Sequence, residues 1–429
     1  MASDREPTPL SEGLERGLGS PVLFAIVWVS LASAVYFALG VVVDHALGLT
    51  PVVFLVASVF FGLAAMTYVE GASLHQDRGG ATVFARYAFN ELVSFIAGWA
   101  ILLDYLILIA VCAVSTTHYA ATFWSPLDEG GLEVAISLGI IALVAIRTTR
   151  GFSRRRAERL AALVVIDIVL QLALVVAGLL TFVSWDGLVD PIDLGNAPKW
   201  DEAIFALGVA TVVLTGLESA SGLAGEVGVR GPGLRRLIAS ATASVALVYV
   251  GIAIVAVTAL PGNEQVSGEH LEDPVIGIAE AVTQQTVSDI LKYTLAGAAT
   301  LTLIGAANSA MLGLSRLAYA LSLNRQIPSR LGRLHKRWST PWVFIALGAL
   351  FAGALAVPED VDALTGIYAF GALLALTIAH LSVVVLRYRE PERRRPYRMP
   401  ANIRIGGGDL PLPAVIGAVF AAAAWLSVV

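Results

Sequence analysis

The sequence is poor in charged residues and in cysteine. Of its 429 residues, 14% are Asp, Glu, Lys or Arg, whereas soluble domains carry about 25%. The single cysteine, Cys112, excludes an intramolecular disulfide and any metal site built from cysteines. The chain also lacks a His-Glu-x-x-His pair and a Ser or Cys nucleophile with a neighbouring base. We therefore expect neither an enzyme nor a bound cofactor or metal.

Long apolar runs dominate what is present. Hydrophobic residues make up 57% of the chain, and the mean hydropathy is +0.77. A helix needs roughly 20 apolar residues to cross a bilayer, whereas barrel strands would show alternating segments of ~10 residues. The runs predict an all-α membrane protein. The eleven runs are 21–43, 50–68, 92–123, 132–146, 160–185, 202–224, 238–260, 286–314, 341–357, 362–386 and 410–429.

The segments that join these runs are alternately rich and poor in Lys and Arg. With the N-terminus placed in the cytoplasm, 26 of the 28 Lys and Arg lie in inside segments, and only Lys199 and Lys292 lie outside. Cytoplasmic loops are rich in Lys and Arg, so the sequence predicts a multi-pass protein of the cytoplasmic (inner) membrane with a cytoplasmic N-terminus. The arginines are spread over six segments, which indicates topology and no nucleic-acid partner. Eleven spans leave the C-terminus outside, and we expect a twelfth helix in a longer parent protein.

Three acidic residues, Asp104, Asp167 and Glu218, lie well inside the predicted spans. A charged side chain at the bilayer centre costs at least ~2.5 kcal/mol and by default marks a functional site. No Lys or Arg lies comparably deep. Each acid is therefore protonated, hydrogen-bonded, hydrated or matched by a transient cation. The pattern favours proton coupling or cation binding; a neutral carboxylic acid held by helix–helix hydrogen bonds is the alternative for each.

Small and hydroxyl-bearing residues gather in the first and sixth runs. Transporter sites near the membrane midplane use interrupted helices, while close packing through small residues is the alternative interpretation. The two runs are five apart, as an inverted five-helix repeat requires, so two breaks there would face each other across a substrate site. The residues concerned are Ser30, Ala32, Ser33 and Ala34 in the first run and Thr215, Gly216 and Glu218 in the sixth.

Four stretches carry family motifs in order along the chain. They are 77–89, with Gly79-Gly80-Ala81 after the second run; 97–105, in the third; 215–232, in and beyond the sixth; and 314–328, at the end of the eighth. Together they resemble the amino acid–polyamine–organocation (APC) superfamily of transporters. The resemblance covers the chain from the first run to the start of the eleventh.

The resemblance implies a LeuT-like 5+5 inverted-repeat helical bundle with discontinuous helices 1 and 6. Residues 1–20 would be a cytoplasmic leader, 21–185 the first repeat, 202–386 the second, and 387–429 a cytoplasmic loop with helix 11. The implied activity is that of a secondary active transporter, a permease that moves an amino acid or related amine by alternating access, with coupling to protons.

The resemblance also implies roles for particular residues. Tyr36, Asp104 and Tyr105 join the residues of the two breaks as substrate-binding candidates. Ala32 and Ala34 stand where the family has a glycine-rich motif for an amino acid carboxylate, which weakens the case for a plain α-amino acid.

Asp167 matches a position at which proton-coupled relatives place a lysine. An acid there would attract a cation or carry a proton, and Asn308 and Ser309 of the eighth run would complete this coupling site.

Two other functions remain open. One is a polyamine or monovalent cation (K⁺) symporter of the same fold, which the unpaired acids and the alanines of the first run favour. The other is a transport-dead sensor. In each case the expected partners are a small-molecule substrate, a proton or monovalent cation, and the lipid bilayer.

Overall fold

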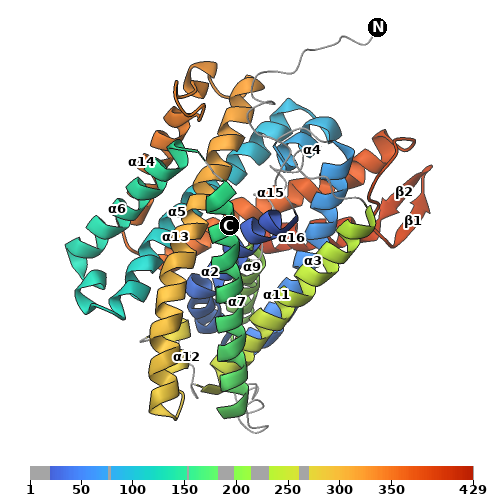
Figure 1. Ribbon diagram of the computed structural model, residues 1–429. Helices are drawn as coiled ribbons and strands as arrows, with labels where there is room; N and C mark the ends of the chain where they lie inside the picture. Colours follow the sequence, from blue (N-terminus) through green and yellow to red (C-terminus); the bar gives the residue numbers. More distant parts are fainter. Residues whose placement is uncertain are drawn as a thin grey trace.

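The computed structural model describes residues 20–75, 79–151, 154–181, 198–213, 231–259 and 270–428 as a bundle of helices with one β-hairpin (Figure 1). The elements are α2 (Ser20–Ala46), η1 (Leu47–Leu49), α3 (Thr50–Leu74), α4 (Ala81–Ala88), α5 (Glu91–Ala121), η2 (Ser125–Asp128), α6 (Gly130–Thr149), α7 (Arg154–Thr181), α9 (Trp200–Val213), α11 (Gly231–Ala259), α12 (Pro274–Glu280), α13 (Gln285–Leu323), η7 (Ser329–Gly332), α14 (Trp342–Ala356), α15 (Val361–Arg389), β1 (Asn402–Ile405), β2 (Gly408–Pro411) and α16 (Leu412–Val428).

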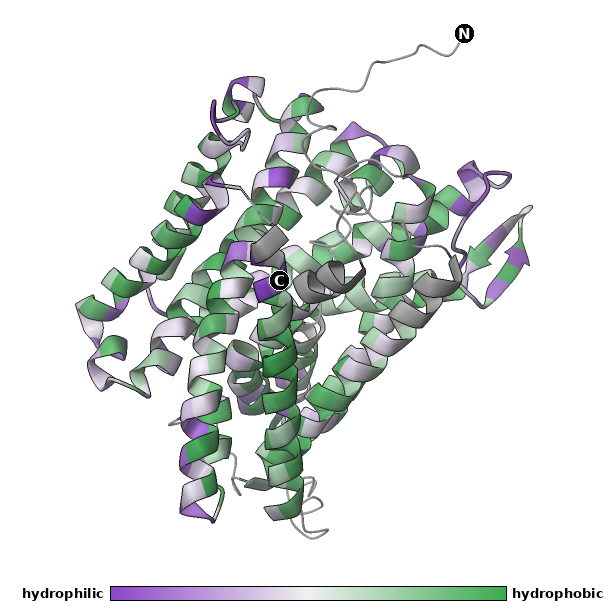
Figure 2. Cartoon of the chain, viewed as in Figure 1, coloured by the Kyte–Doolittle hydropathy of each residue, from purple (hydrophilic) through white to green (hydrophobic). Residues whose placement is uncertain are grey.

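Each of the eleven predicted runs contains a helix, so the all-helical fold class is confirmed. Seven stretches of the described chain are long and apolar enough to cross a membrane, and one of them, Trp28–Leu74, takes in both α2 and α3. Figure 2 shows hydrophobic residues along the lengths of these helices and hydrophilic ones mainly in the connecting segments. The protein is therefore a multi-pass membrane protein.

Local sequence accounts for several helix starts. Asn90 caps α5 by accepting a hydrogen bond from the Val93 amide at 3.0 Å, and Asp360 caps α15 in the same way through Ala363 at 2.9 Å. Pro51 and Pro274 stand in the first turns of α3 and α12, where a missing amide hydrogen costs no helical bond.

The expected break in the first helix is wrong. Helix α2 is continuous from Ser20 to Ala46, and Ala32 and Ala34 are helical and buried within it. Alanine has the highest helix propensity of any residue, so a run of small residues without glycine favours an intact helix with close neighbours. The second expected break, at Thr215–Leu217, lies outside the described residues.

Four pairs of helices that are five apart in the order of the predicted runs pack against each other as follows. Helix α2 packs on α9, α3 on α11, α5 on α13, and α6 on α14. Small residues allow some of the closest approaches. A Cβ atom at Gly313 of α13 would lie 2.6 Å from Cζ of Tyr105 on α5, and one at Gly371 of α15 would lie 3.0 Å from the Ala100 carbonyl oxygen on α5.

The hairpin between α15 and α16 was not predicted from the sequence. Strands β1 and β2 are antiparallel, with Ile405 paired to Gly408 across a two-residue turn. The turn residues Gly406 and Gly407 have φ values of 59° and 82°, which glycine adopts without strain and which two-residue hairpin turns require.

Candidate functional site

The buried carboxyl group of Asp167 on α7 is the centre of a polar network between helices. It accepts hydrogen bonds from the Tyr36 hydroxyl on α2 at 2.6 Å, from the Thr302 hydroxyl on α13 at 3.0 Å, and from the Gln171 side-chain amide at 2.8 Å. Asp167, Gln171, Tyr36 and Thr302 are all fully buried. No Lys, Arg or His of the described chain pairs with Asp167, so its charge is met by neutral donors alone.

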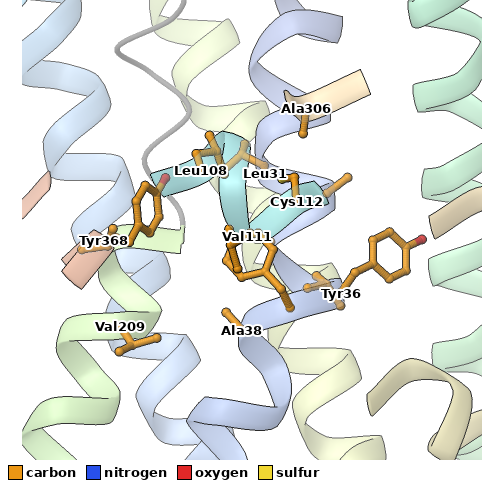
Figure 3. Close-up of a cluster of buried hydrophobic side chains, with 14 of the residues drawn as sticks. Leu31, Tyr36, Ala38, Leu108, Val111, Cys112, Val209, Ala306 and Tyr368 are labelled. Atoms are coloured by element: carbon orange, nitrogen blue, oxygen red, sulfur yellow. The ribbon is translucent and has the colours of Figure 1, made fainter. Parts of the chain in front are cut away.

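Helix α2 is tied to its neighbours through its own backbone carbonyls. The Tyr119 hydroxyl on α5 donates to the Tyr36 carbonyl at 2.9 Å, and the Tyr249 hydroxyl on α11 donates to the Leu31 carbonyl. The Gln171 amide also lies 3.4 Å from the Ala32 carbonyl. Because a helical carbonyl has a second lone pair, these bonds add to the helix without breaking it. Figure 3 shows the Tyr36 ring pointing away from the neighbouring apolar side chains.

The predicted residues of α2 divide into two groups. Tyr36 reaches Asp167, so a residue expected at the substrate site and one expected at the coupling site form one network. Ser33 donates to the Ser30 carbonyl at 2.9 Å within the same helix, and Ala32 and Ala34 pack in the core.

Asp104 and Tyr105 lie on α5 and are both buried. The Asp104 backbone faces Gly371 of α15, and the Tyr105 ring packs on Gly313 of α13. Asp104 and Tyr105 thus lie where α5 meets α15 and α13. Thr215, Gly216 and Glu218 lie outside the described residues.

On α13, the contact that we expected from Asn308 and Ser309 is made by Thr302. Asn308 lies six residues further along the helix, which at 1.5 Å per residue is about 9 Å. Asn308 and Ser309 therefore lie on the same helix as Thr302 but at a different depth, and their place in a coupling site stays a prediction.

Sequence reasoning missed four members of the network: Gln171, Thr302, Tyr119 and Tyr249. Only Gln171 carries a local signal, since it follows Asp167 by four residues and therefore lies on the same helix face. The other three come from helices that only the fold brings together.

A second buried acid was also missed. Glu70 near the end of α3 forms a bidentate pair with Arg387 of α15, with distances of 2.6 Å to Nε and 2.8 Å to Nη2. Both side chains are about 98–99% buried, and the Met399 amide donates to Glu70 at 2.8 Å. The predicted second run ends at residue 68, two residues before Glu70.

The arrangement around Asp167 permits a change of charge at one buried group that three helices share. A carboxylate accepts charge-assisted hydrogen bonds that are roughly twice as strong as neutral ones. The gain or loss of a proton at Asp167 would therefore change the strength of the hydrogen bonds that join α2 and α13 to α7.

Known proteins resemble this chain over most of its length. The sequence profile of a family described as "Amino acid permease" matches residues 18–427, nearly the whole chain. The branched-chain amino acid permease BcaP of Bacillus subtilis is 23% identical over 370 residues, which cover 82% of this chain and 76% of that protein.

Two further relatives are named as transporters of cationic amino acids and of putrescine. The vacuolar cationic amino acid transporter 2 of Arabidopsis thaliana is 27% identical over 399 residues, 89% of this chain, and the match spans 61% of that transporter's length. The low-affinity putrescine importer PlaP of Escherichia coli K12 is 25% identical over 350 residues, 79% of this chain and 73% of the importer.

Proposed function

We propose that this chain, which belongs to the amino acid permease family, is a secondary active transporter that moves an amino acid or a related amine across the cytoplasmic membrane in company with protons. Members of a permease family are transporters and not enzymes. The observation that carries the finer proposal is the fully buried Asp167, whose carboxyl group joins three helices and has no fixed cationic partner in the described chain.

The packing of the helices supports a 5+5 repeat with alternating access. In a 5+5 repeat, each contact between two helices should recur between the two helices that lie five places away in the order of runs. The contact of α2 with α7 corresponds in this way to that of α9 with α15. The contact of α7 with α13 likewise corresponds to that of α15 with α5. The contact of α3 with α9 corresponds to that of α11 with α2, and all these contacts are present. Because five spans reverse the direction of the chain, such a repeat would be inverted.

In this proposal, Asp167 carries the coupled proton. As a carboxylate it holds Tyr36, Gln171 and Thr302 by charge-assisted hydrogen bonds, and protonation removes that assistance. The bonds that join α2 and α13 to α7 then weaken together, which would allow the first helix to move relative to the others. The remaining predicted residues, including Asp104, Tyr105, Asn308 and Ser309, stay candidates for the substrate and coupling sites.

A polyamine or a monovalent cation is a second candidate substrate. The side-chain oxygen of Gln171 is buried and has no donor among the described residues, and it lies on the residue that contacts Asp167. A carboxylate beside a spare amide oxygen suits a hard cation, and the chain is similar to a putrescine importer.

A thermal-shift screen of the purified protein with amino acids, diamines and K⁺ tests these candidates. A ligand that binds only the folded protein raises its melting temperature by mass action. We expect stabilisation by a member of one class. A shift with K⁺ or diamines and none with amino acids would support the second candidate and contradict the first.

Replacing Glu218 by Gln is expected to abolish uptake while the protein still reaches the membrane and elutes as a folded species in size-exclusion chromatography. Gln keeps the size and hydrogen bonding of Glu but removes the charge that would bind an ammonium group or carry a proton. Radiolabelled uptake in cells that express equal amounts of each protein measures the effect. Normal transport by the Gln variant would assign Glu218 to helix packing.

Single cysteines are expected to report a cytoplasmic N-terminus. Because the native Cys112 is fully buried, it should give little background. A membrane-impermeant maleimide added outside cells should label Asp190→Cys and Glu269→Cys, and should miss Lys336→Cys and Arg394→Cys until the membrane is opened. Labelling with the opposite pattern would invert the proposed topology.

A further inference from the structure

A cavity rich in arginine lies where the C-terminal end of α15 meets the β-hairpin. Its volume is about 270 Å³, near the lower end of the roughly 300–1,000 Å³ that small-ligand sites occupy. Two acids, Glu392 and Asp409, also line it. The five arginines that line it are Arg387, Arg393, Arg395, Arg398 and Arg404.

The hairpin explains how Arg404 reaches this cavity. Successive residues of a strand point to opposite faces, and Arg404 lines the cavity while Ile403 and Ile405 on either side of it are 45% and 51% exposed. The hairpin is seated on α15 through Gly408, where a Cβ atom would lie 2.6 Å from the Tyr388 ring. One face of β1 therefore carries Arg404, and the other presents two apolar side chains; Figure 2 shows hydrophilic and hydrophobic residues side by side in the hairpin.

Carboxylates neutralise only part of this positive charge. Arg387 pairs with Glu70, Arg398 pairs with Asp409, and Arg393 pairs with Glu390 at 3.0 Å. The side chain of Arg387 is 98% buried, and its Nη1 atom has no hydrogen-bond partner in the described chain. Because this nitrogen is enclosed by the protein, Arg387 acts on an anion in the cavity through its charge.

The other two arginines have no carboxylate partner among the described residues. Arg395 donates to the carbonyls of Leu386 and Glu390, both at 2.9 Å. Burial lowers the pKa of the Arg395 guanidinium; the charges of Glu70 and Glu390 oppose this effect, and those of Arg387 and Arg398 add to it. An anion in the cavity would relieve this repulsion.

We propose that this cavity binds a phosphate-bearing anion, and that the physiological ligand is the head group of an anionic phospholipid. The guanidinium fork matches phosphate oxygens in two-bonded geometry, and Arg395 and Arg404 line the cavity without a carboxylate partner among the described residues. The exposed Ile403 and Ile405 lie on the hairpin at the end of a spanning helix, where they can enter the membrane interface beside the bound head group. The charge distribution predicts that this end faces the cytoplasm, whose leaflet holds the anionic lipids.

Ligand-dependent thermal shifts of the full chain in detergent test this site. The probes are inorganic phosphate, short-chain phosphatidylglycerol and short-chain phosphatidylcholine. We expect phosphatidylglycerol to stabilise the wild-type protein and phosphatidylcholine to have little effect. Arg395→Gln and Arg404→Gln should each weaken the apparent affinity roughly tenfold or more, since each removes a hydrogen bond from a charged group.

Arg394→Gln is the matched control, because Arg394 is exposed, carries the same charge in the same loop and does not line the cavity. It should bind phosphatidylglycerol as the wild-type protein does. Competition by inorganic phosphate would show that a free phosphate also occupies the site, and its absence would restrict the site to lipid; either result supports an anion site. Equal losses in Arg394→Gln and Arg404→Gln, equal stabilisation by phosphatidylcholine, or no stabilisation by phosphatidylglycerol would overturn the proposal.

Discussion

Asp167→Asn is expected to abolish gradient-driven accumulation of substrate and to leave exchange across the membrane intact. Asn has the shape of Asp, so its oxygen still accepts from Tyr36 and Thr302. Its amide would oppose the amide of Gln171, but rotation of the Gln171 group presents the side-chain oxygen that lacks a donor among the described residues. The network therefore survives, and only the ability to gain and lose a proton is removed.

Reconstituted vesicles measure this effect. One proton per substrate and a gradient of one pH unit sustain about a tenfold accumulation, which the Asn variant should lose while counterflow of labelled substrate persists. Tyr36→Phe is the matched control, because it deletes one donor to Asp167 and keeps the carboxyl group. It should transport more slowly and still accumulate substrate. Unchanged accumulation in Asp167→Asn would exclude Asp167 as the coupling residue.

Arg387→Met is expected to destabilise the protein by about 3–5 kcal/mol, because it leaves the buried Glu70 carboxylate without its partner. Arg398→Met is the matched control, since it breaks an arginine–carboxylate pair whose side chains are 48% and 39% exposed, and such a pair contributes about 0–1 kcal/mol. Unfolding in mixed detergent micelles compares the two variants. The double variant Glu70→Met with Arg387→Met should recover much of the loss. Equal losses of stability in Arg387→Met and Arg398→Met would show that burial does not increase the contribution of the Glu70–Arg387 pair.

The sequence predicted the positions of the helices well because a bilayer demands long apolar runs, and all eleven runs contain helices. It failed for α2, where small residues are compatible with either a broken helix or close packing. Ala32 and Ala34 are good helix formers, and the structure shows an intact helix whose carbonyls accept side-chain donors.

The hairpin was missed because its strands have four residues each and lie in a basic loop. A usable signal was present, since glycines at a turn beside alternating isoleucines are typical of a two-residue hairpin.

At the candidate site, the sequence identified Asp167 as a buried acid but identified few of its partners. Gln171 could have been found from helical spacing. The contact of Thr302 with Asp167 depends on the relative position of α13 and α7 along their axes, which no local sequence pattern determines. Glu70 and Arg387 are 317 residues apart, and each lies within a few residues of the end of an apolar run. Such pairs follow from the packing of α3 against α15 and not from periodicity.

Transport by the wild-type chain in proteoliposomes tests the central proposal most directly. Vesicles with an imposed inward proton gradient would be offered labelled branched-chain amino acids, cationic amino acids and putrescine in turn. The proposal predicts that at least one of them accumulates above its external concentration and that a protonophore collapses the accumulation. Failure of every compound to accumulate, or accumulation that a protonophore leaves unchanged, would contradict it.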